Sequence, residues 1–395
     1  MTVLVLMLIP AALAVSCVVT SLVLRATSSA GMLDTAAMPG QVKEAARRVP
    51  NTGGIGVVAG VIVPMAAGLG VVWLGAGGAG SDWLGSNWLG SDLPGDAAVY
   101  LDGVRSETWL GLLVMGGVLV LHALGLVDDR KPLGPVVKLL VMAAVALAVI
   151  VAGDTRLFTA LDSAAGGSWA SVLLTLAWFL AVTNAMNFID NMDGLSAGAT
   201  LVASGCFLVA SLVAEQWFVS AMLALLVGAC AGFLVWNRPP ARIFMGDGGS
   251  LVLGFLLAFL TTRTTYFGQT PEGTPLAGGW YGVFMPVLVL AVPLYDLVSV
   301  TAIRIRQGRS PMVGDLQHLS HRLVKRGFSK AGAVGVMLTL TVITGISGIV
   351  IGRLPAWGAA LVAAQTCVLL GLLATIEFAT SPSGARRDSL EVGHD

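Results

Sequence analysis

Acidic side chains stand at the ends of apolar segments in this sequence, where they could bind a divalent metal. Asp128 and Asp129 follow one apolar segment directly, and Asp247 lies between two later segments. Adjacent carboxylates repel each other, and partial burial raises their pKa values unless a cation lies nearby. Mg²⁺ prefers oxygen ligands and keeps substrate phosphates in its shell. The pair therefore predicts a magnesium site, although a solvated helix end neutralised by Arg130 and Lys131 is the alternative interpretation.

A second polar cluster follows another apolar segment. Asn187, Asp190, Asn191 and Asp193 place four carboxyl or amide groups within seven residues. Helix capping would explain one of them, such as Asp193 before the next helix. It does not explain all four, so we expect this cluster to line a polar site.

A third cluster contains glycines beside an acidic residue. Gly248 and Gly249 follow Asp247, and they permit the close approach of a ligand to the backbone. Ser250 opens the next apolar segment, and a helix N-terminus at this position would suit an anion. The alternative is an ordinary tight turn with a serine cap.

The fourth cluster lies in a long basic segment between two apolar ones. His318, His321 and Arg322 have a spacing that would place them on one face of a helix. A basic helix at the membrane surface would explain the arginine, but it gives no reason for the two histidines.

The elements that must position these clusters are membrane-spanning helices. Of the 395 residues, 56% are hydrophobic and only 11% are charged, which excludes a soluble globular protein. Lys+Arg and Asp+Glu number 22 each, so no basic field indicates nucleic acid as a partner. A spanning helix needs about 20 apolar residues. The predicted fold is all-α with eleven spans, at 2–24, 54–75, 108–126, 135–152, 169–189, 197–214, 217–236, 250–265, 281–303, 331–351 and 355–377.

The distribution of Lys and Arg predicts how these spans are oriented. With the N-terminus outside and the C-terminus inside, all but four of the 22 basic residues fall on the inner side. The four exceptions are Arg105, Arg156, Arg263 and Arg353. The same orientation places every acidic cluster on the cytoplasmic side. We expect a single transmembrane catalytic domain at 1–377 and a short, polar, disordered tail at 378–395.

Taken together, the four clusters describe one site at the inner face of a membrane. It offers carboxylates for a metal, amides for hydrogen bonds, glycines near a phosphate and cations for a diphosphate. Phosphoryl transfer needs these groups, because its barrier falls mainly through positioning and charge neutralisation.

The motifs resemble those of the polyprenyl-phosphate N-acetylhexosamine-1-phosphate transferases, glycosyltransferase family 4. The resemblance covers about residues 25–330, and four motifs occur in family order: Val127–Arg130, Asn187–Gly198, Phe244–Ser250 and the His318/His321 segment. It implies transfer of a sugar 1-phosphate, most often N-acetylglucosamine 1-phosphate, from a UDP-sugar to undecaprenyl phosphate. UMP would be released, and a cell-envelope glycan would be started. It also implies Mg²⁺, with Mn²⁺ as the alternative cofactor, a multi-pass protein of the inner (plasma) membrane, and a homodimer in some relatives.

The resemblance also implies roles for individual residues. The expected catalytic residues are Asp128, Asp129, Asp190 and Asp247. The expected metal ligands are Asp247, Asp128, Asp129 and Asn187. The expected substrate-binding residues are Lys138, Asn187, Asn191, Asp193, Asn237, Arg242, Phe244, His318, His321 and Arg322, with Phe244 stacking on uracil. Ser320 stands where a histidine is common in the family, and the segment 47–54 is shortened.

Two other functions remain as alternatives. A CDP-alcohol phosphotransferase also uses an Asp-Gly motif, but it would need an Arg and further Asp residues after Asp193-Gly194, where this chain has an uncharged span. A transporter of a charged solute would place its charges near the middle of the membrane. Asp296 lies well inside a predicted span, whereas Glu377 stands at the very end of the last one. Asp296 could support the site indirectly or pair with a neighbouring helix, and the sequence does not decide between these roles.

Overall fold

The computed structural model describes residues 1–29, 49–75, 103–159, 161–264, 284–312, 314–352 and 354–378. In these ranges every regular element is a helix. The helices are α1 (Thr2–Ser29), α2 (Gly54–Gly75), α5 (Thr108–Asp128), α6 (Pro135–Ala152), α7 (Leu161–Ala165), α8 (Trp169–Phe188), α9 (Leu195–Val213), α10 (Trp217–Asn237), α11 (Asp247–Thr264), α12 (Met285–Val289), α13 (Ala291–Arg306), α14 (Leu319–Lys325), α15 (Lys330–Ile351) and α16 (Ala356–Phe378). The predicted tail, 378–395, lies outside the described residues except for its first residue, which ends α16.

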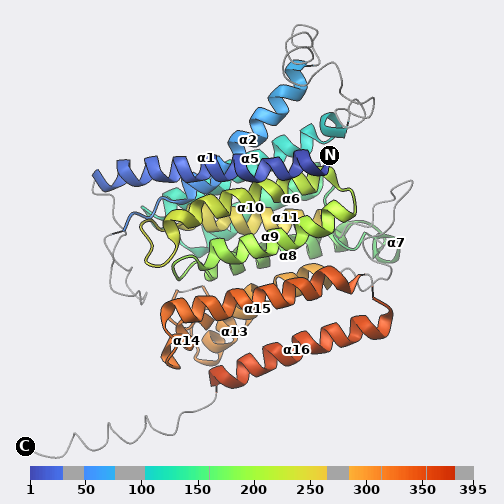
Figure 1. The fold of residues 1–395 in the computed structure, drawn as a ribbon. Coiled ribbons are helices and arrows are strands. Elements are labelled where there is room, and N and C mark those ends of the chain that lie inside the picture. Colours follow the sequence, from blue (N-terminus) through green and yellow to red (C-terminus); the bar gives the residue numbers. More distant parts are fainter. Residues whose placement is uncertain are drawn as a thin grey trace, which may run out of the picture.

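The long helices lie side by side in one bundle (Figure 1). In the described part of the chain, nine helices are long and apolar enough to cross a membrane. The prediction of an all-α protein with several membrane spans is therefore confirmed. The exact number of eleven stays a prediction, because α11 and the pair α12–α13 are not among the nine.

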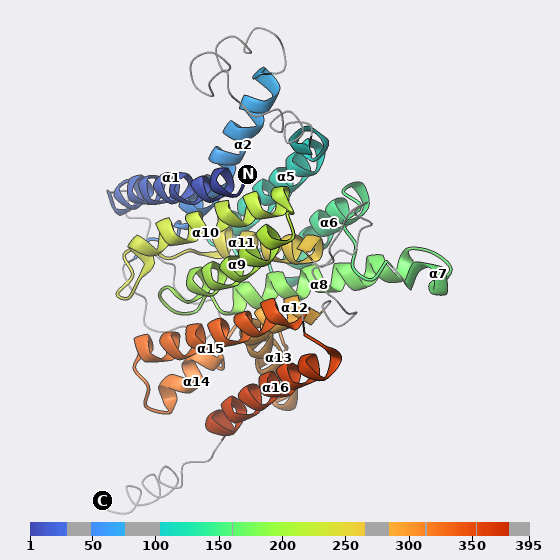
Figure 2. The same cartoon turned by 45° about the vertical axis from the view of Figure 1, so that its right-hand side comes forward.

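Helix α11 occupies the centre of the bundle (Figures 1 and 2). It packs against α2, α5, α8, α9 and α10. Every residue from Gly248 to Thr262 is buried. A helix enclosed by protein does not need the hydrophobicity that lipid contact demands, which explains why α11 is less apolar than the nine candidate spans.

The predicted span at 281–303 is not one helix. The chain forms the short α12 and then α13, with Leu290 between them. Pro293 explains the break, because proline has no N–H to donate to the carbonyl of Val289 and its ring collides with that carbonyl. The single helix that we predicted for this segment is corrected to two pieces.

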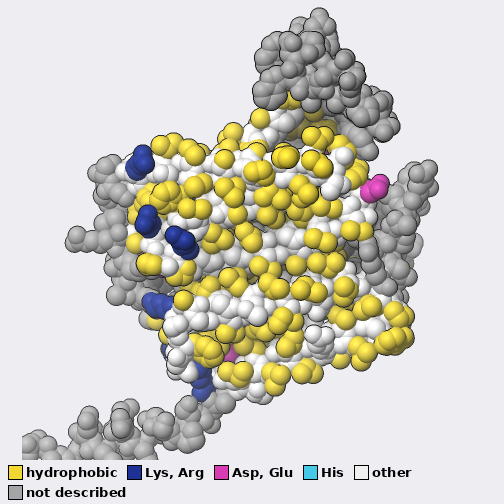
Figure 3. Space-filling model, in the orientation of Figure 1, with side chains coloured by type: hydrophobic (Ala, Val, Ile, Leu, Met, Phe, Trp, Pro, Cys, Tyr) yellow, Lys and Arg dark blue, Asp and Glu magenta, His cyan; other side chains and the backbone are white. Residues whose placement is uncertain are grey.

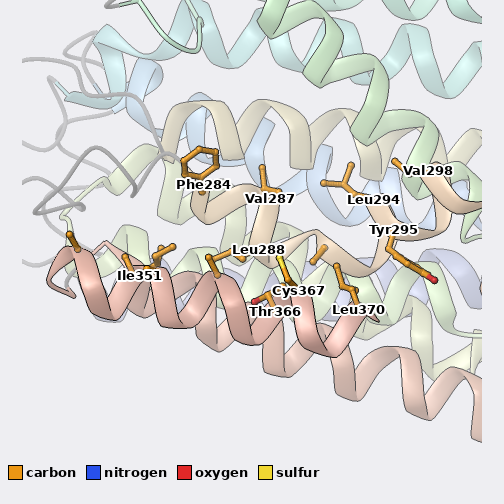
Figure 4. Close-up of a pocket in the computed structure, with 15 residues that line it drawn as sticks. Phe284, Val287, Leu288, Leu294, Tyr295, Val298, Ile351, Thr366, Cys367 and Leu370 are labelled. Carbon is orange, nitrogen blue, oxygen red and sulfur yellow. The ribbon is translucent and has the colours of Figure 1, made fainter. Parts of the chain in front are cut away.

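An apolar groove of about 610 Å³ runs between these two helices and α16. Phe284, Val287, Leu294 and Cys367 are among the side chains that line it (Figure 4). Figure 2 shows α16 at the edge of the bundle, and α15 separates it from α9. None of the acidic clusters lines this groove, so it is not the polar site.

Basic side chains gather at one end of the bundle. In Figure 3 the visible Lys and Arg residues all lie toward the left, where α1 ends and α14 lies. The acidic clusters come from the ends of α5 and α8 and from the beginning of α11, and these are at the same end. The bundle thus brings the polar clusters together beside its basic end, as their predicted common orientation requires.

Candidate active site

Asp247 is the first residue of α11, and residues of two other helices hold its carboxylate. Lys138 of α6 forms an ion pair with Oδ2, and the Asn187 amide of α8 donates to Oδ1 over 2.9 Å. The same amide nitrogen of Asn187 lies 2.9 Å from the Ser250 hydroxyl. Three helices therefore fix the position of the Asp247 carboxylate.

Asp129 caps the N-terminus of α11 from outside that helix. Its carboxylate accepts from the backbone N–H of Asp247 at 3.1 Å and from that of Gly248 at 3.4 Å. The next two amides, of Gly249 and Ser250, donate to the carbonyl of Gly246. The first four N–H groups of the helix are thus used within the protein. The anion at this helix N-terminus is the Asp129 side chain, which neither interpretation of the sequence included.

The segment 50–53, before α2, is hydrogen-bonded to the loop that precedes Asp247. Phe244 N–H donates to the carbonyl of Pro50, and Gly53 N–H donates back to the carbonyl of Phe244, both over 2.8 Å. Asn51 then donates its side-chain amide to Asp129 at 3.1 Å. Gly246 has φ +72°, and a side chain there would collide with Asp129 and Asn51. Only glycine suits both this backbone and this contact.

Asp128 lies beside the same lysine. Its Oδ2 pairs with Lys138 at 3.0 Å, and its Oδ1 accepts from the backbone N–H of Leu133 at 2.8 Å. One ammonium group therefore bridges the carboxylates of Asp128 and Asp247. In this arrangement Asp128 also fixes the turn between α5 and α6.

The carboxylates of this cluster outnumber its cations. Burial and the charges of Asp247 and Asp128 raise the pKa of Asp129 to about 7. Burial, with the charges of Asp247 and Asp129, raises the pKa of Asp190 well above its ordinary value. Within the described ranges, no hydrogen bond or ion pair joins the side chain of Asp190 to another residue. The site thus has an excess of negative charge that a cation would relieve.

A metal site with three protein ligands is not preformed. Within the described residues no group of three or more His, Cys, Asp or Glu side chains is arranged to hold a metal ion. Mg²⁺, however, is often held by one or two carboxylates together with substrate phosphates and water. The unpartnered Asp190 beside Asp247 fits this second mode of binding.

The second cluster braces the loop between α8 and α9. Asn237 is buried, accepts from the N–H of Gly194 at 2.9 Å and donates to the carbonyl of Ile243 at 2.8 Å. Asp193 accepts from the N–H of Ala241 at 2.8 Å. These side chains tie the 190–194 loop to the loop that carries Phe244, so the described contacts of Asn237 are internal to the protein.

Two predicted nucleotide-binding side chains lie near the surface of that second loop. Phe244 is half-buried, and Arg242 is exposed with its guanidinium carbon 5.8 Å from the ring centre of Trp236. Asn191 donates to the carbonyl of Phe188 at 2.6 Å and accepts from the Ser320 hydroxyl at 2.5 Å. The loop between α8 and α9 is therefore joined to α14 as well.

His318 and His321 lie at the beginning of α14 and are buried. Nδ1 of His318 is 2.8 Å from Oδ2 of Asp296, and the two histidine ring centres are 6.5 Å apart. The ring of His318 also meets that of Phe188 edge-on, with 5.4 Å between centres. The histidine segment is thus brought against the end of α8, as a single site requires.

Arg322 points to a different partner. It forms an ion pair with the buried Glu377 of α16 at 2.9 Å and donates to Ser299 Oγ at 2.7 Å. These contacts anchor the C-terminal helix to α14. The structure therefore does not bring Arg322 into the carboxylate cluster.

Sequence reasoning missed three residues that organise the site. Asn51 supports Asp129, Ser320 holds Asn191, and Arg304 lies 5.3 Å from the ring centre of Phe188 while it pairs with Asp315 at 2.9 Å. The position of Arg304 at the inner end of a predicted span does not indicate that it contacts Phe188 or pairs with Asp315. Only the contact between distant segments reveals these roles.

Comparison with known proteins gives consistent results. Residues 111–265 match the model described as glycosyl transferase family 4. The chain is 29% identical over 264 residues to the "Probable undecaprenyl-phosphate N-acetylglucosaminyl 1-phosphate transferase" of Bacillus subtilis, covering 66% of this chain and 71% of the relative. It is 33% identical over 250 residues to the "Decaprenyl-phosphate N-acetylglucosaminephosphotransferase" of Mycobacterium tuberculosis, covering 58% and 59%.

A third relative belongs to the same group by name. The "Undecaprenyl-phosphate alpha-N-acetylglucosaminyl 1-phosphate transferase" of Escherichia coli is 29% identical over 238 residues, covering 58% of this chain and 61% of the relative. The matched region thus spans about three-fifths of the length of the mycobacterial and E. coli proteins. Residues 111–265, which match the family model, contain all four carboxylates of the cluster.

Proposed function

Because residues 111–265 match the model of glycosyl transferase family 4, we propose that this protein transfers N-acetylglucosamine 1-phosphate from a UDP-sugar to undecaprenyl phosphate. The products would be an undecaprenyl-diphosphate sugar and UMP. The observation that carries the proposal is the gathering of Asp128, Asp129, Asp190 and Asp247 around a single Lys138. The names of the relatives support the same class of reaction.

In the proposed reaction, an oxygen of the lipid phosphate attacks the phosphorus that carries the sugar. A new P–O bond forms there, and the bond from that phosphorus to the bridging oxygen breaks, so UMP leaves with the bridging oxygen. The attacking oxygen is already anionic, so the protein must mainly hold two negative groups close together. Lys138 would offset part of their charge, and Asn187 would keep Asp247 oriented.

Asp247 and Asp190 are the residues that we propose to hold Mg²⁺. Bound there, the ion would neutralise the charge of the phosphates. Asp128 and Asp129 have other partners in the structure, the backbone of Leu133 and the N-terminus of α11. We therefore assign to these two the positioning of Lys138 and of Asp247, respectively.

We propose that the 242–244 loop receives the nucleotide. Phe244 is half-buried and can offer a ring face to uracil, and Arg242 is exposed beside it for the diphosphate. The backbone hydrogen bonds of Phe244 with Pro50 and Gly53 keep this loop next to Asp247. The nucleotide site and the carboxylate cluster would thus share one rigid support.

We further propose that the site faces the cytoplasm from the plasma membrane. Basic residues at the polar end of the bundle support this orientation. A reporter fused after Gly314 should be found inside the cell, and one fused after Gly95 outside. Finding both reporters on the same side would contradict the orientation.

The direct test is transfer by the purified protein in detergent. UDP-[¹⁴C]GlcNAc, UDP-[¹⁴C]GalNAc and UDP-[¹⁴C]glucose are each incubated with undecaprenyl phosphate and Mg²⁺, and both the organic-soluble label and UMP are measured. We expect equal amounts of lipid-linked label and UMP with UDP-GlcNAc. A protein that binds lipid but forms no labelled lipid from any of the three donors would refute the proposal.

A further inference from the structure

Asp296 is a fully buried carboxylate with an unusual pair of partners. It lies on α13 and has no exposed surface. Oδ2 lies 2.8 Å from Nδ1 of His318, and Oδ1 accepts from the backbone N–H of Leu319 at 2.6 Å. Both oxygens are therefore directed to the beginning of α14.

The arginine of the same helix does not neutralise this carboxylate. Arg304 donates to the carbonyl of Pro311 at 2.7 Å and pairs with Asp315 at 2.9 Å. A buried carboxylate is costly unless hydrogen bonds satisfy it. For Asp296 the two donors from α14 serve this purpose, so its side chain is bound to the histidine segment.

The contact with Asp296 determines which nitrogen of His318 can meet a ligand. Nδ1–H donates to the carboxylate whether or not the ring carries a second proton. Nε2 is therefore the nitrogen that can contact a ligand. The ring is also held edge-on against Phe188, whose neighbour Asn187 hydrogen-bonds Asp247. The imidazole is thus fixed in position relative to the carboxylate cluster.

We infer that Asp296 is a positioning residue that sets the tautomer and ring plane of His318 and so presents Nε2 to the phosphates of the substrate. The inference rests on the proposed function and assigns Asp296 a part in it. The alternative is a purely structural role, in which Asp296 only caps α14 through Leu319. The two roles differ in whether the effect of changing Asp296 depends on His318.

The Asp296→Asn variant separates these roles. Two N–H groups, from His318 and Leu319, donate to the two carboxylate oxygens of Asp296. An asparagine side chain has only one oxygen, so it can accept from only one of them at these two positions. The backbone N–H of Leu319 cannot change, so the amide nitrogen would meet His318 Nδ1 and move the imidazole proton to Nε2. The wrong tautomer should lower kcat/KM for transfer at least about tenfold.

The test is a double-mutant cycle in detergent, with Asp296→Asn, His318→Ala and both together. We expect the double variant to lie within about twofold of His318→Ala, since no imidazole remains to be positioned. Asp162→Asn is the matched control, because Asp162 is also a paired carboxylate, 2.5 Å from Arg156, at the other end of the bundle. It should keep wild-type activity.

A double variant whose loss equals the product of the two single losses would overturn the inference. So would an Asp296→Asn variant within twofold of wild type. If Asp296→Asn is not recovered as folded protein, Asp296→Glu, which retains the charge but shifts the carboxylate, completes the same cycle. Wild-type turnover is measured first, so absence of transfer there refutes the proposed function rather than the role of Asp296.

Discussion

Helices α11 and α14 begin in the same way and differ in what surrounds their first residues. Each has its N-terminal backbone capped by a carboxylate from another helix. Asp129 follows α5 and caps α11, and Asp296 of α13 caps α14. A side-chain carboxylate satisfies the free N–H groups and suits the positive end of a helix.

The surroundings of the two capping carboxylates are opposite in character. Asp129 is half-buried among Asp128, Asp190 and Asp247, and its pKa is raised to about 7. Asp296 is completely buried and meets an imidazole. The comparison shows that one capping arrangement can serve two purposes. At α11 it leaves negative charge for a ligand to neutralise, and at α14 it fixes a side chain.

The largest effect should come from removing charge at α11. Asp247→Asn keeps the size of the side chain but removes the carboxylate that pairs with Lys138. We expect transfer to fall by more than about 100-fold while membrane insertion is normal, as shown by radiolabelled product formation and by the yield of inserted protein. Activity above about a tenth of wild type, a barrier change of only ~1.4 kcal/mol, would exclude Asp247 from the site.

The charge accumulated around Asp129 should appear as a dependence of stability on pH. The folded pKa of about 7 exceeds the ordinary aspartate pKa of 3.8, so ionised Asp129 destabilises the folded protein above pH 7, and this effect vanishes as pH falls through 3.8. In chelator, Asp129→Asn should therefore raise the melting temperature at pH 8, by an amount corresponding to at most about 4 kcal/mol.

The rise in melting temperature caused by Asp129→Asn should be smaller at pH 5 and should disappear at lower pH. Thermal unfolding in detergent measures this rise. Asp162→Asn is the control, because Ser171 and Arg156 favour the ionised carboxylate there and lower its pKa. A lower melting temperature for Asp129→Asn at pH 8 would mean that the capping interaction outweighs the repulsion. That result would contradict the proposed difference between α11 and α14, in which Asp129 is repelled by its neighbours and Asp296 is not.

A moderate effect is expected at the loop before α11. If Phe244 stacks on uracil, Phe244→Ala should raise KM for the UDP-sugar by roughly 5- to 150-fold, because stacking contributes about 1–3 kcal/mol per base. The kcat value and KM for undecaprenyl phosphate should change little. Steady-state kinetics with each substrate varied in turn provides the check. A collapse of kcat with an unchanged nucleotide KM would instead indicate that Phe244 only supports Asp247.

The smallest change in kinetics should come from α14, where the substitution removes one hydrogen bond and no charge. Ser320→Ala removes the 2.5 Å hydrogen bond to Asn191. A hydrogen bond contributes about 0.5–1.5 kcal/mol net, so KM for the UDP-sugar should rise about 2- to 12-fold with kcat nearly constant. Ser329→Ala, whose hydroxyl caps α15 away from this contact, is the control. Equal kinetics for both variants would show that Asn191 does not need Ser320.

The helices and the polar clusters could be predicted because both depend on local sequence. Apolar segments of the right length give spans, and Asn187 to Asp193 form their cluster within a few residues. The capping of α11 could not be predicted, because Asp129 is 118 residues from the amide of Asp247 in the chain. The break before Pro293 was visible in the sequence, but we gave the apolar run more weight than the proline.

The enclosure of α11 has a consequence for how the chain is assembled in the membrane. Its five packing partners, α2, α5, α8, α9 and α10, all precede it in the sequence. A segment that carries Asp247 and Arg263 is a poor candidate for independent entry into lipid. During synthesis, however, it emerges after every helix that will surround it. The helix can thus enter a space that is already lined by protein, and an internal deletion of α9 and α10 should leave α11 outside the bilayer.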